Sequence, residues 1–280
     1  MDERAVTEAM IWRYREYLEE EERSRNTIEK YMRDIRAFYS WLSGRPACRQ
    51  ELTAYKEMLR STYAVRSINS MLSSVNSFLR FYGWEDCCVR QIRVQKQIFC
   101  AQEKELSKEE YRRLVETARK EKKERLEAVL QTICATGIRI SELPFITVEA
   151  VFRGNTAVSC KGKYRQIFLP QKLQYFLRRY IKKRKIRTGP VFVTESGKTW
   201  DRSNIWREMK ALCLKAGVRP EKVFPHNLRH LFARTYYNMR KDIAKLADIL
   251  GHSNINTTRI YIISTGEEHQ RQIGMLGLVL

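Results

Sequence analysis

The stretch DILGHSNINTTRIYI, which ends at Ile262, combines residue types that can do chemistry. His252 can accept or donate a proton near neutral pH, and Tyr261, nine residues later, carries a phenol that becomes a nucleophile when it loses its proton. A free phenol has a pKa of about 10, so Tyr261 needs a base or a strongly positive pocket. The alternative interpretation is a surface segment with a half-buried tyrosine.

Three other stretches carry side chains that suit the same chemistry: ATGIRISEL with Arg139, CKGKYR with Lys161, and HNLRH with His226 and Arg229. An arginine offers a planar fork of donors that matches phosphate oxygens and stays charged. Two arginines can therefore stabilise the charge that develops on the non-bridging oxygens of a phosphodiester. If the fold brings them together with a tyrosine nucleophile, these residue types suit phosphoryl transfer.

The charge of the chain indicates the partner. Lys and Arg number 53 against 32 Asp and Glu, which gives a net charge of +21. Residues 1–105 carry 18 basic and 16 acidic side chains, whereas residues 106–280 carry 35 and 16, a net charge of +19. Solubility needs far less, so we expect the second part to bind nucleic acid. A membrane surface is the minor alternative, because no strongly amphipathic basic helix with an aromatic face stands out.

Several classes of protein are disfavoured. No run of eighteen apolar residues exists, and the first ten residues lack an apolar signal core, so we expect a cytoplasmic protein without a membrane span. The cysteines are odd in number and form no CxxC pair, which disfavours a disulfide framework and a zinc site. No GxxxxGK[ST] motif or clustered carboxylates occur, and we expect neither a metal nor a cofactor. The seven cysteines are Cys48, Cys87, Cys88, Cys100, Cys134, Cys160 and Cys213.

The elements that position these residues fall into two domains. NTIEKYMRDIRAFYSWLSG predicts an amphipathic helix, with Asn26 as its N-cap and Glu29 as the reciprocal partner. Helices are also expected near residues 7–20 and 51–60 and over AVRSINSMLSSVNSFLRFYG. Residues 1–90 therefore form a four-helix domain, and the polar residues 91–105 form a linker.

The second predicted domain spans residues 106–280. Ser107 and Glu110 mark the beginning of its first helix. TVEAVF, TAVSC and YRQIFL alternate between apolar and polar residues and predict three short strands. We therefore expect a mainly α protein in which a small three-stranded antiparallel sheet interrupts the helical second domain.

Five short motifs resemble those of the tyrosine recombinase, or phage integrase, family in both sequence and order along the chain. They are ATGIRISEL, CKGKYR, HNLRH, LGH and TTRIY. An HxxR motif alone occurs often by chance, whereas five stretches in the family's order are specific. The resemblance covers nearly the whole chain, because the first domain is similar to the family's SAM-like core-binding domain and the second to its catalytic domain. The catalytic residues that it implies are Arg139, Lys161, His226, Arg229, His252 and Tyr261.

The resemblance also implies a role for each residue. Tyr261 joins the 3′-phosphate of a DNA strand and releases a 5′-hydroxyl. His226 is the candidate base or a donor to the phosphate, His252 is a second donor, and His230 resembles a supporting position. Lys161 resembles the general acid that protonates the leaving oxygen, because the family's pattern favours the lysine before the glycine over Lys163, two residues away. One ester replaces another, so no nucleotide cofactor is required.

DNA contacts are harder to assign. Lys163 and Arg165 are candidates for contacts with the DNA backbone, with plain solvated charges as the alternative. Arg66 and Arg80, on the fourth helix of the first domain, are further candidates for DNA contacts. The basic run RRYIKKRKIRTG is interpreted as a solvated or phosphate-facing helix end.

The resemblance implies double-stranded DNA with short core sites as the partner, a homo-tetramer on two duplexes, and an accessory directionality factor. The apolar end of the chain, with Leu276, Leu278 and Val279, either docks into a neighbouring protomer or packs on its own domain. Integration of a mobile element is the preferred role, and DNA inversion and Xer-type resolution are alternatives. A type IB topoisomerase and a non-catalytic DNA-binding relative are the competing interpretations.

Overall fold

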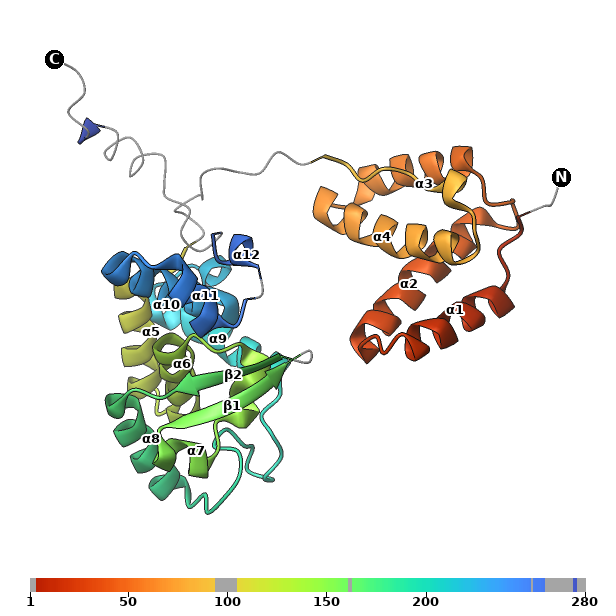
Figure 1. Cartoon of the computed structure of the whole chain (residues 1–280). Coiled ribbons are helices and arrows are strands. Elements are labelled where there is room, and N and C mark those ends of the chain that lie inside the picture. The colour runs from red at the N-terminus through yellow and green to blue at the C-terminus, as the bar shows by residue number, and fades with distance from the viewer. Residues whose placement is uncertain (1–3, 94–104, 161–162, 253, 260–273, 276–280) are drawn as a thin grey trace. The chain divides into compact units, whose positions relative to one another are not determined.

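The computed structural model describes residues 4–93, 105–160, 163–252, 254–259 and 274–275. The chain divides into two compact units, Met1–Lys96 and Gln97–Leu280, which are called the N-terminal and C-terminal units below (Figure 1). Among the described residues, no helix is long and apolar enough to cross a membrane.

The N-terminal unit is built from four helices around one core. The apolar stripe of the second helix is buried as the sequence predicts, because its members recur at helical spacing and face the other helices. Its elements are α1 (Glu8–Glu20), α2 (Arg25–Leu42), α3 (Arg49–Thr62), α4 (Val65–Phe81) and the short 3₁₀ helix η1 (Glu85–Cys87).

The beginning of α2 differs from the prediction. Ser24, in extended conformation, is the N-cap, and its hydroxyl accepts a hydrogen bond from the Thr27 backbone N–H. Asn26 lies inside the first turn and so cannot be the cap. The sequence RSRN contains two capping residues, and the upstream one adds another half turn of helix.

The C-terminal unit is mainly helical and is centred on α6 (Glu124–Thr136), which is buried along most of its length. α6 packs against four other helices of the unit. The other elements are α5 (Lys108–Lys120), η3 (Ile140–Phe145), α7 (Val148–Arg153), β1 (Asn155–Cys160), β2 (Lys163–Phe168), α8 (Gln171–Arg184), α9 (Arg202–Ala216), η4 (Pro220–Lys222), α10 (Pro225–Arg240), α11 (Ile243–Leu250) and α12 (Ile255–Arg259).

The sheet has two strands where the sequence predicts three. β1 and β2 pair antiparallel, from Asn155 opposite Phe168 to Cys160 opposite Lys163. The segment TVEAVF, predicted as a strand, is helix α7. Thr147 caps it by accepting from the Ala150 backbone N–H, and the apolar residue that a strand would turn inward, Phe152, is 56% exposed.

Two helices end at glycines next to residues of interest. Gly137 ends α6 with a φ of 66°, and Gly251 ends α11 with a φ of 66°, a left-handed conformation that favours glycine. The sequence ILGH, in which a glycine follows an apolar helical run, predicts a helix end just before His252, and α11 ends there. The next segment, SNINTT, predicts a turn in which Thr257 caps a short helix TRIY. α12 instead starts earlier, at Ile255, and the side chain of Asn254 accepts from the Asn256 backbone N–H. Thr257 thus lies inside α12 and does not cap it.

Candidate active site

Arg139 is placed directly after the end of α6. The chain leaves the helix at Gly137, buries Ile138 and then enters η3 with Arg139 as its first flanking residue. The Glu142 carboxylate accepts the Arg139 backbone N–H at 2.6 Å and the Arg139 Nη1 at 3.1 Å. The same carboxylate therefore orients both the backbone and the guanidinium, as the spacing of the two residues suggests. The Arg139 side chain remains 35% exposed.

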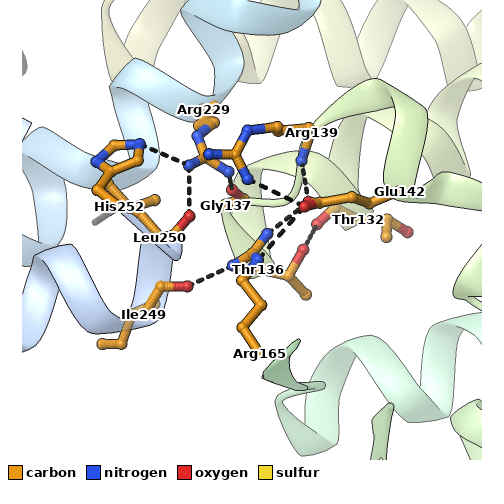
Figure 2. Close-up of polar contacts among 10 residues, drawn as sticks. All are labelled: Thr132, Thr136, Gly137, Arg139, Glu142, Arg165, Arg229, Ile249, Leu250 and His252. Atoms are coloured by element: carbon orange, nitrogen blue, oxygen red, sulfur yellow. Dashed lines mark hydrogen bonds and ion pairs between the residues drawn. The ribbon is translucent and has the colours of Figure 1, made fainter. Parts of the chain in front are cut away.

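Glu142 is a buried carboxylate between two arginines (Figure 2). Arg165, from β2, donates from Nη2 to Glu142 Oε2 at 2.5 Å and from Nε to Glu142 Oε1 at 3.4 Å. Burial alone would raise the pKa of Glu142, but the hydrogen bonds from Arg165 and Arg139 and their positive charges outweigh it and lower that pKa. Glu142 is therefore charged at neutral pH.

Arg229 is buried in α10 and is held by the ends of two other helices. Its Nη1 donates to the Gly137 carbonyl at 2.7 Å, and its Nη2 donates to the Leu250 carbonyl at 2.7 Å. Both carbonyls lie at helix C-termini, where the helix dipole is negative and the last carbonyls lack partners within the helix. These dipoles compensate part of the cost of burying a guanidinium that is only 1% exposed.

The hydrogen bonds of His252 define its tautomer. Its Nε2 lies 3.0 Å from Arg229 Nη2, and its Nδ1 lies 2.8 Å from the hydroxyl of buried Thr258. A guanidinium can only donate, so Nε2 must be the acceptor and the proton must be on Nδ1. Burial, followed by the charges of Arg229, Arg139 and other neighbours, lowers the pKa of His252 to about 4. The ring is neutral near neutral pH.

Two more histidines lie on the first turns of α10. His226 and His230 are one turn apart, and their rings meet edge to face with centroids 4.6 Å apart. His226 is exposed, but partial desolvation of its ring and the charges of Arg229 and Arg139 still lower its pKa. Burial and the neighbouring His226 lower the pKa of His230 to about 3. Both rings are therefore neutral, and His226 can accept a proton.

The predicted residues thus fall into three groups. Arg139, Arg229 and His252 belong to one network, and Arg139 and Arg229 also contribute to the lowered pKa of His226. Lys161 and Tyr261 lie outside the described residues, so their catalytic roles stay predictions. The remaining candidates are for DNA contact: Arg66 and Arg80 are exposed on α4, the side chain of Lys163 is not described, and Arg165 is part of the network with little exposure.

Within the described part, the network carries an excess of positive charge. Arg139 and Arg165 contact the single carboxylate of Glu142, Arg229 is held by backbone carbonyls, and the nearby histidines are neutral. Such a site is suited to an anion that can accept several hydrogen bonds, and a phosphodiester is one.

Residues 104–268 match the Phage integrase family, and residues 11–86 match the Phage integrase, N-terminal SAM-like domain. The chain belongs to the phage integrase family. The tyrosine recombinase family predicted from the sequence is therefore confirmed, and with it the function of a site-specific DNA recombinase. The first match spans all the predicted catalytic positions without assigning their individual roles.

Individual relatives agree with this family. The recombinase is 28% identical to tyrosine recombinase XerA from Pyrococcus furiosus over 100% of this chain and 98% of the relative. Its fold is similar to that of a lambda integrase fragment bound as a dimer to a COC′ core site, with a TM-score of 0.75, 16% identity and coverage of 92% and 95%. The Tn1549 transposon integrase in complex with transposon right end DNA gives a TM-score of 0.70 at 16% identity, with coverage of 95% and 99%.

Sequence reasoning missed two members of this recombinase's network. Arg165 was assigned to DNA contact or solvent, although the alternation in β2 places it on the same side as Ile167, which is buried. Thr258, which fixes the His252 tautomer, gave no signal, since a threonine in a short polar helix is common. Its role depends on how α12 returns towards the end of α11.

Proposed function

We propose that the recombinase cuts DNA by attack of the Tyr261 phenol on a phosphodiester. The bond from the tyrosine oxygen to phosphorus forms while the bond from phosphorus to the 5′-oxygen breaks. The products are a 3′-phosphotyrosyl link and a 5′-hydroxyl. A second 5′-hydroxyl then attacks this link, releases Tyr261 and restores a phosphodiester. The observation that supports this proposal most directly is the position of Arg139 and buried Arg229 beside His226 and His252 in a chain of this family.

Arg139 and Arg229 would each hold a non-bridging oxygen of the phosphate. Arg229 is preorganised for this task, because the Gly137 and Leu250 carbonyls fix its guanidinium before DNA arrives. Donors that are already oriented cost no reorganisation during the reaction and stabilise the developing charge in a partly dry site. A phosphate oxygen would compete with His252 Nε2 for Nη2 of Arg229.

A neutral histidine and a lysine carry out the two proton transfers in this proposal. His226 accepts the proton of Tyr261, and Lys161 gives a proton to the leaving 5′-oxygen, so that the charges balance. His252 can donate to the phosphate only after Nε2 gains a proton, because its proton now lies on Nδ1. An arriving phosphate favours that change, since its negative charge raises the pKa of a neighbouring histidine.

The test is the formation of a covalent protein–DNA adduct. Duplexes are selected from a random pool by the Tyr261→Phe protein and are then nicked at successive positions, which lets the short 5′ fragment diffuse away after cleavage. We expect the unmodified protein to form an adduct that survives denaturant, and the Tyr261→Phe protein to bind the same duplex without forming one. An adduct of equal yield with Tyr261→Phe would refute the nucleophile assignment.

The same duplexes test the general acid and the need for metal. We expect Lys161→Ala to slow cleavage of a normal phosphodiester and to have little effect on a 5′-thio leaving group, which needs no protonation. Equal slowing with both leaving groups would contradict the role of Lys161. Because the arginines supply the charge that metals supply elsewhere, we expect cleavage to persist in chelator; loss of cleavage would overturn the proposal of a metal-independent reaction.

We further propose that the recombinase acts in the cytoplasm as a homo-tetramer on two duplexes, with integration of a mobile element as its role. The residues suggested for docking, Leu276, Leu278 and Val279, lie outside the described residues. Deletion of residues 276–280 should leave cleavage of one nicked duplex unchanged and reduce the mass of the assembly on paired sites. Retention of the tetramer would show that the tail packs on its own domain. An accessory directionality factor would be recognised by its effect on integration relative to excision.

A further inference from the structure

Arg165 was expected at the DNA backbone or in solvent, and its contacts assign it elsewhere. Side chains alternate between the two faces of β2, and Arg165 points to the same face as buried Ile167, while Tyr164 and Phe168 on the opposite face are exposed. The Arg165 side chain is only 9% exposed. An arginine with so little exposure on an apolar strand face requires partners, and here they are the Glu142 carboxylate and the Ile249 carbonyl.

The guanidinium of Arg165 joins two segments that carry catalytic residues (Figure 2). On one side its Nη2 and Nε reach both oxygens of Glu142, which in turn binds Arg139. On the other side its Nη1 donates to the Ile249 carbonyl in the last turn of α11. The next three residues of the chain are Leu250, whose carbonyl holds Arg229, then Gly251 and His252.

The stem of Arg165 makes a third contact, with Gly251. A methyl group on Gly251 would lie 2.4 Å from the Cδ of Arg165, so only glycine leaves space for this side chain. The turn that delivers His252 is therefore packed against Arg165. This contact and the hydrogen bond to the Ile249 carbonyl fix the same segment from two directions.

Arg165 also determines what charge is left for a substrate. Glu142 has one negative charge and two guanidinium neighbours, at 2.5 Å for Arg165 and 3.1 Å for Arg139. With Arg165 in place, the carboxylate is neutralised and the charge of the more exposed Arg139 is available to a phosphate. Without Arg165, Glu142 would bind Arg139 more tightly and turn its guanidinium away from an incoming anion.

We propose that Arg165 is a positioning residue that neutralises Glu142 for Arg139 and holds the end of α11 for His252. This inference rests on the proposed phosphoryl transfer. It concerns the rate of cleavage and predicts no part for Arg165 in binding DNA. It also links β2, which follows directly after the segment with Lys161, to the two segments that carry Arg139 and His252.

The first experiment uses Arg165→Met and Arg165→Lys, with Arg153→Met as a matched control that removes an exposed arginine beside β1. Adduct formation on a saturating nicked duplex is measured in a single turnover, below the unfolding temperature of every variant. We expect Arg165→Met to be about 100-fold slower, since misplacing a reacting group by about 1 Å costs this much. Lysine has no fork to join both partners, so Arg165→Lys should also be slow. Arg153→Met should cleave at nearly the normal rate.

DNA affinity separates positioning from contact with the DNA backbone. Loss of one phosphate contact lowers the slope of log Kd against log salt by about one and weakens binding on all sequences. We expect Arg165→Met to keep the salt slope and the Kd of the unmodified protein while cleavage falls. A lower slope with a normal cleavage rate at saturation would overturn the proposal in favour of a DNA contact.

A double-mutant cycle tests whether Arg165 acts through Glu142. If it does, Glu142→Gln and Arg165→Met should each slow cleavage, and the double variant should be no slower than the slower single variant. The double variant lacks the Glu142 carboxylate that Arg165→Met alone would leave without its main partner. It can therefore be measured even if Arg165→Met alone does not fold. Independent, multiplying losses of rate would contradict the proposed route through Glu142.

Gly251→Ala disturbs the same contact without altering a charge, and Gly217→Ala is its matched control. Gly217 ends α9 with a φ of 60° and has open space around an added Cβ, whereas Gly251 has Arg165 there. Both variants meet the same backbone strain. We expect only Gly251→Ala to slow cleavage, and equal rates for the two would argue against the positioning role.

If the unmodified protein forms no adduct, the proposed function fails. If it forms one and all the variants cleave at the same rate as the unmodified protein, only this inference about Arg165 fails.

Discussion

Each unit of the recombinase buries a carboxylate among cationic side chains, but the two clusters are balanced differently. In the N-terminal unit, Asp34 of α2 is 2% exposed and lies 2.9 Å from Lys30 Nζ, and it accepts a hydrogen bond from the Ser74 hydroxyl of α4 at 3.0 Å. Lys30 also donates to the Ser70 carbonyl. Arg33, a second neighbour, is 75% exposed and remains largely in solvent. One buried negative charge is thus matched by one partly buried positive charge.

In the cluster of the C-terminal unit, the positive side chains outnumber the carboxylates that contact them. Among the described residues, Glu142 is the one carboxylate that contacts Arg139 and Arg165, and Arg229 is held by backbone carbonyls. Excess buried charge costs stability, and a fold retains it where an anion supplies the missing compensation. The balanced cluster joins α2 to α4, whereas the cluster with two arginines on one carboxylate lies where we propose that the phosphate binds.

The largest effect that would test this comparison is expected from Arg229→Lys. Lysine keeps the charge but cannot bind the Gly137 and Leu250 carbonyls and a phosphate oxygen with one fixed fork. We expect adduct formation at saturating DNA to fall by about 100- to 1,000-fold, the loss typical for one preorganised donor to a transition state. Asp34→Asn in the other cluster should leave that rate unchanged. A similar loss of rate in both variants would remove the distinction between the clusters.

The second prediction concerns stability, and here we expect the larger effect in the N-terminal unit. Asp34→Ala leaves Lys30 partly buried without its carboxylate, so we expect the N-terminal unit to lose about 3 kcal/mol of unfolding free energy. Urea unfolding of the full chain can be followed for each unit by peroxide oxidation of buried methionines, Met32 in the N-terminal unit and Met209 in the C-terminal unit. Only the Met32 transition should move. A shift of the Met209 transition would show that the two units unfold together.

The fold was largely predictable because its signals are local. The amphipathic stripe of α2 and the Ser107–Glu110 capping box of α5 are read from neighbouring residues, and both elements form as expected. The strand prediction for TVEAVF was wrong because six residues carry too little periodicity to distinguish a strand from a short helix. Its assignment depended on Thr147 as a cap and Gly154 as a helix end, each of which also fits a turn before or after a strand.

The site was predictable in its residue types and less so in its supporting contacts. Arg139, Arg229 and His252 are separated by up to 113 positions in the sequence, and only the resemblance to a family grouped them. The carbonyls of Gly137 and Leu250 that hold Arg229 belong to the backbone, which leaves no mark in the sequence. Long-range contacts of this kind depend on how the helices pack, and local patterns do not specify packing.

The third prediction compares the glycines that end a helix in each unit. Gly137 and Gly83 have φ values of 66° and 69°, so alanine meets similar backbone strain at both, about 1 kcal/mol. An added Cβ at Gly137 would lie 2.4 Å from Cδ1 of Phe232, whereas at Gly83 nothing lies within 4 Å. We expect Gly137→Ala to cost about 2 kcal/mol in the Met209 transition and to slow cleavage, because its carbonyl holds Arg229. Gly83→Ala should cost about half as much, in the Met32 transition alone. Equal costs would show that α10 moves away from Gly137 freely.

The smallest effect is the response of the two units to acid. The histidines of the chain lie at positions 226, 230, 252 and 269, all in the C-terminal unit. Burial, with the neighbouring His226, lowers the pKa of His230 to about 3, so the unfolded chain takes up a proton near pH 6.5 that the folded chain refuses. Stability must then fall as the pH drops from about 6.5 to about 4.5. For His230 we expect the unfolding free energy to fall by about 1–2 kcal/mol, after allowance for the partial exposure of its ring. His252 lowers the unfolding free energy further in the same direction.

The acid response sharpens the comparison because it should appear in one unit alone. Methionine oxidation by peroxide changes little over this pH range, so urea transitions at Met209 and Met32 can be compared directly. The Met209 midpoint should fall on acidification, the Met32 midpoint should stay nearly constant, and His230→Asn should reduce the slope for Met209. Below about pH 4.5 carboxylates such as Glu142 begin to contribute, which limits the test to the window above. Parallel falls at both methionines would mean that the partly buried His230 and His252 do not explain the acid sensitivity, and that the positive cluster is less desolvated than its contacts imply.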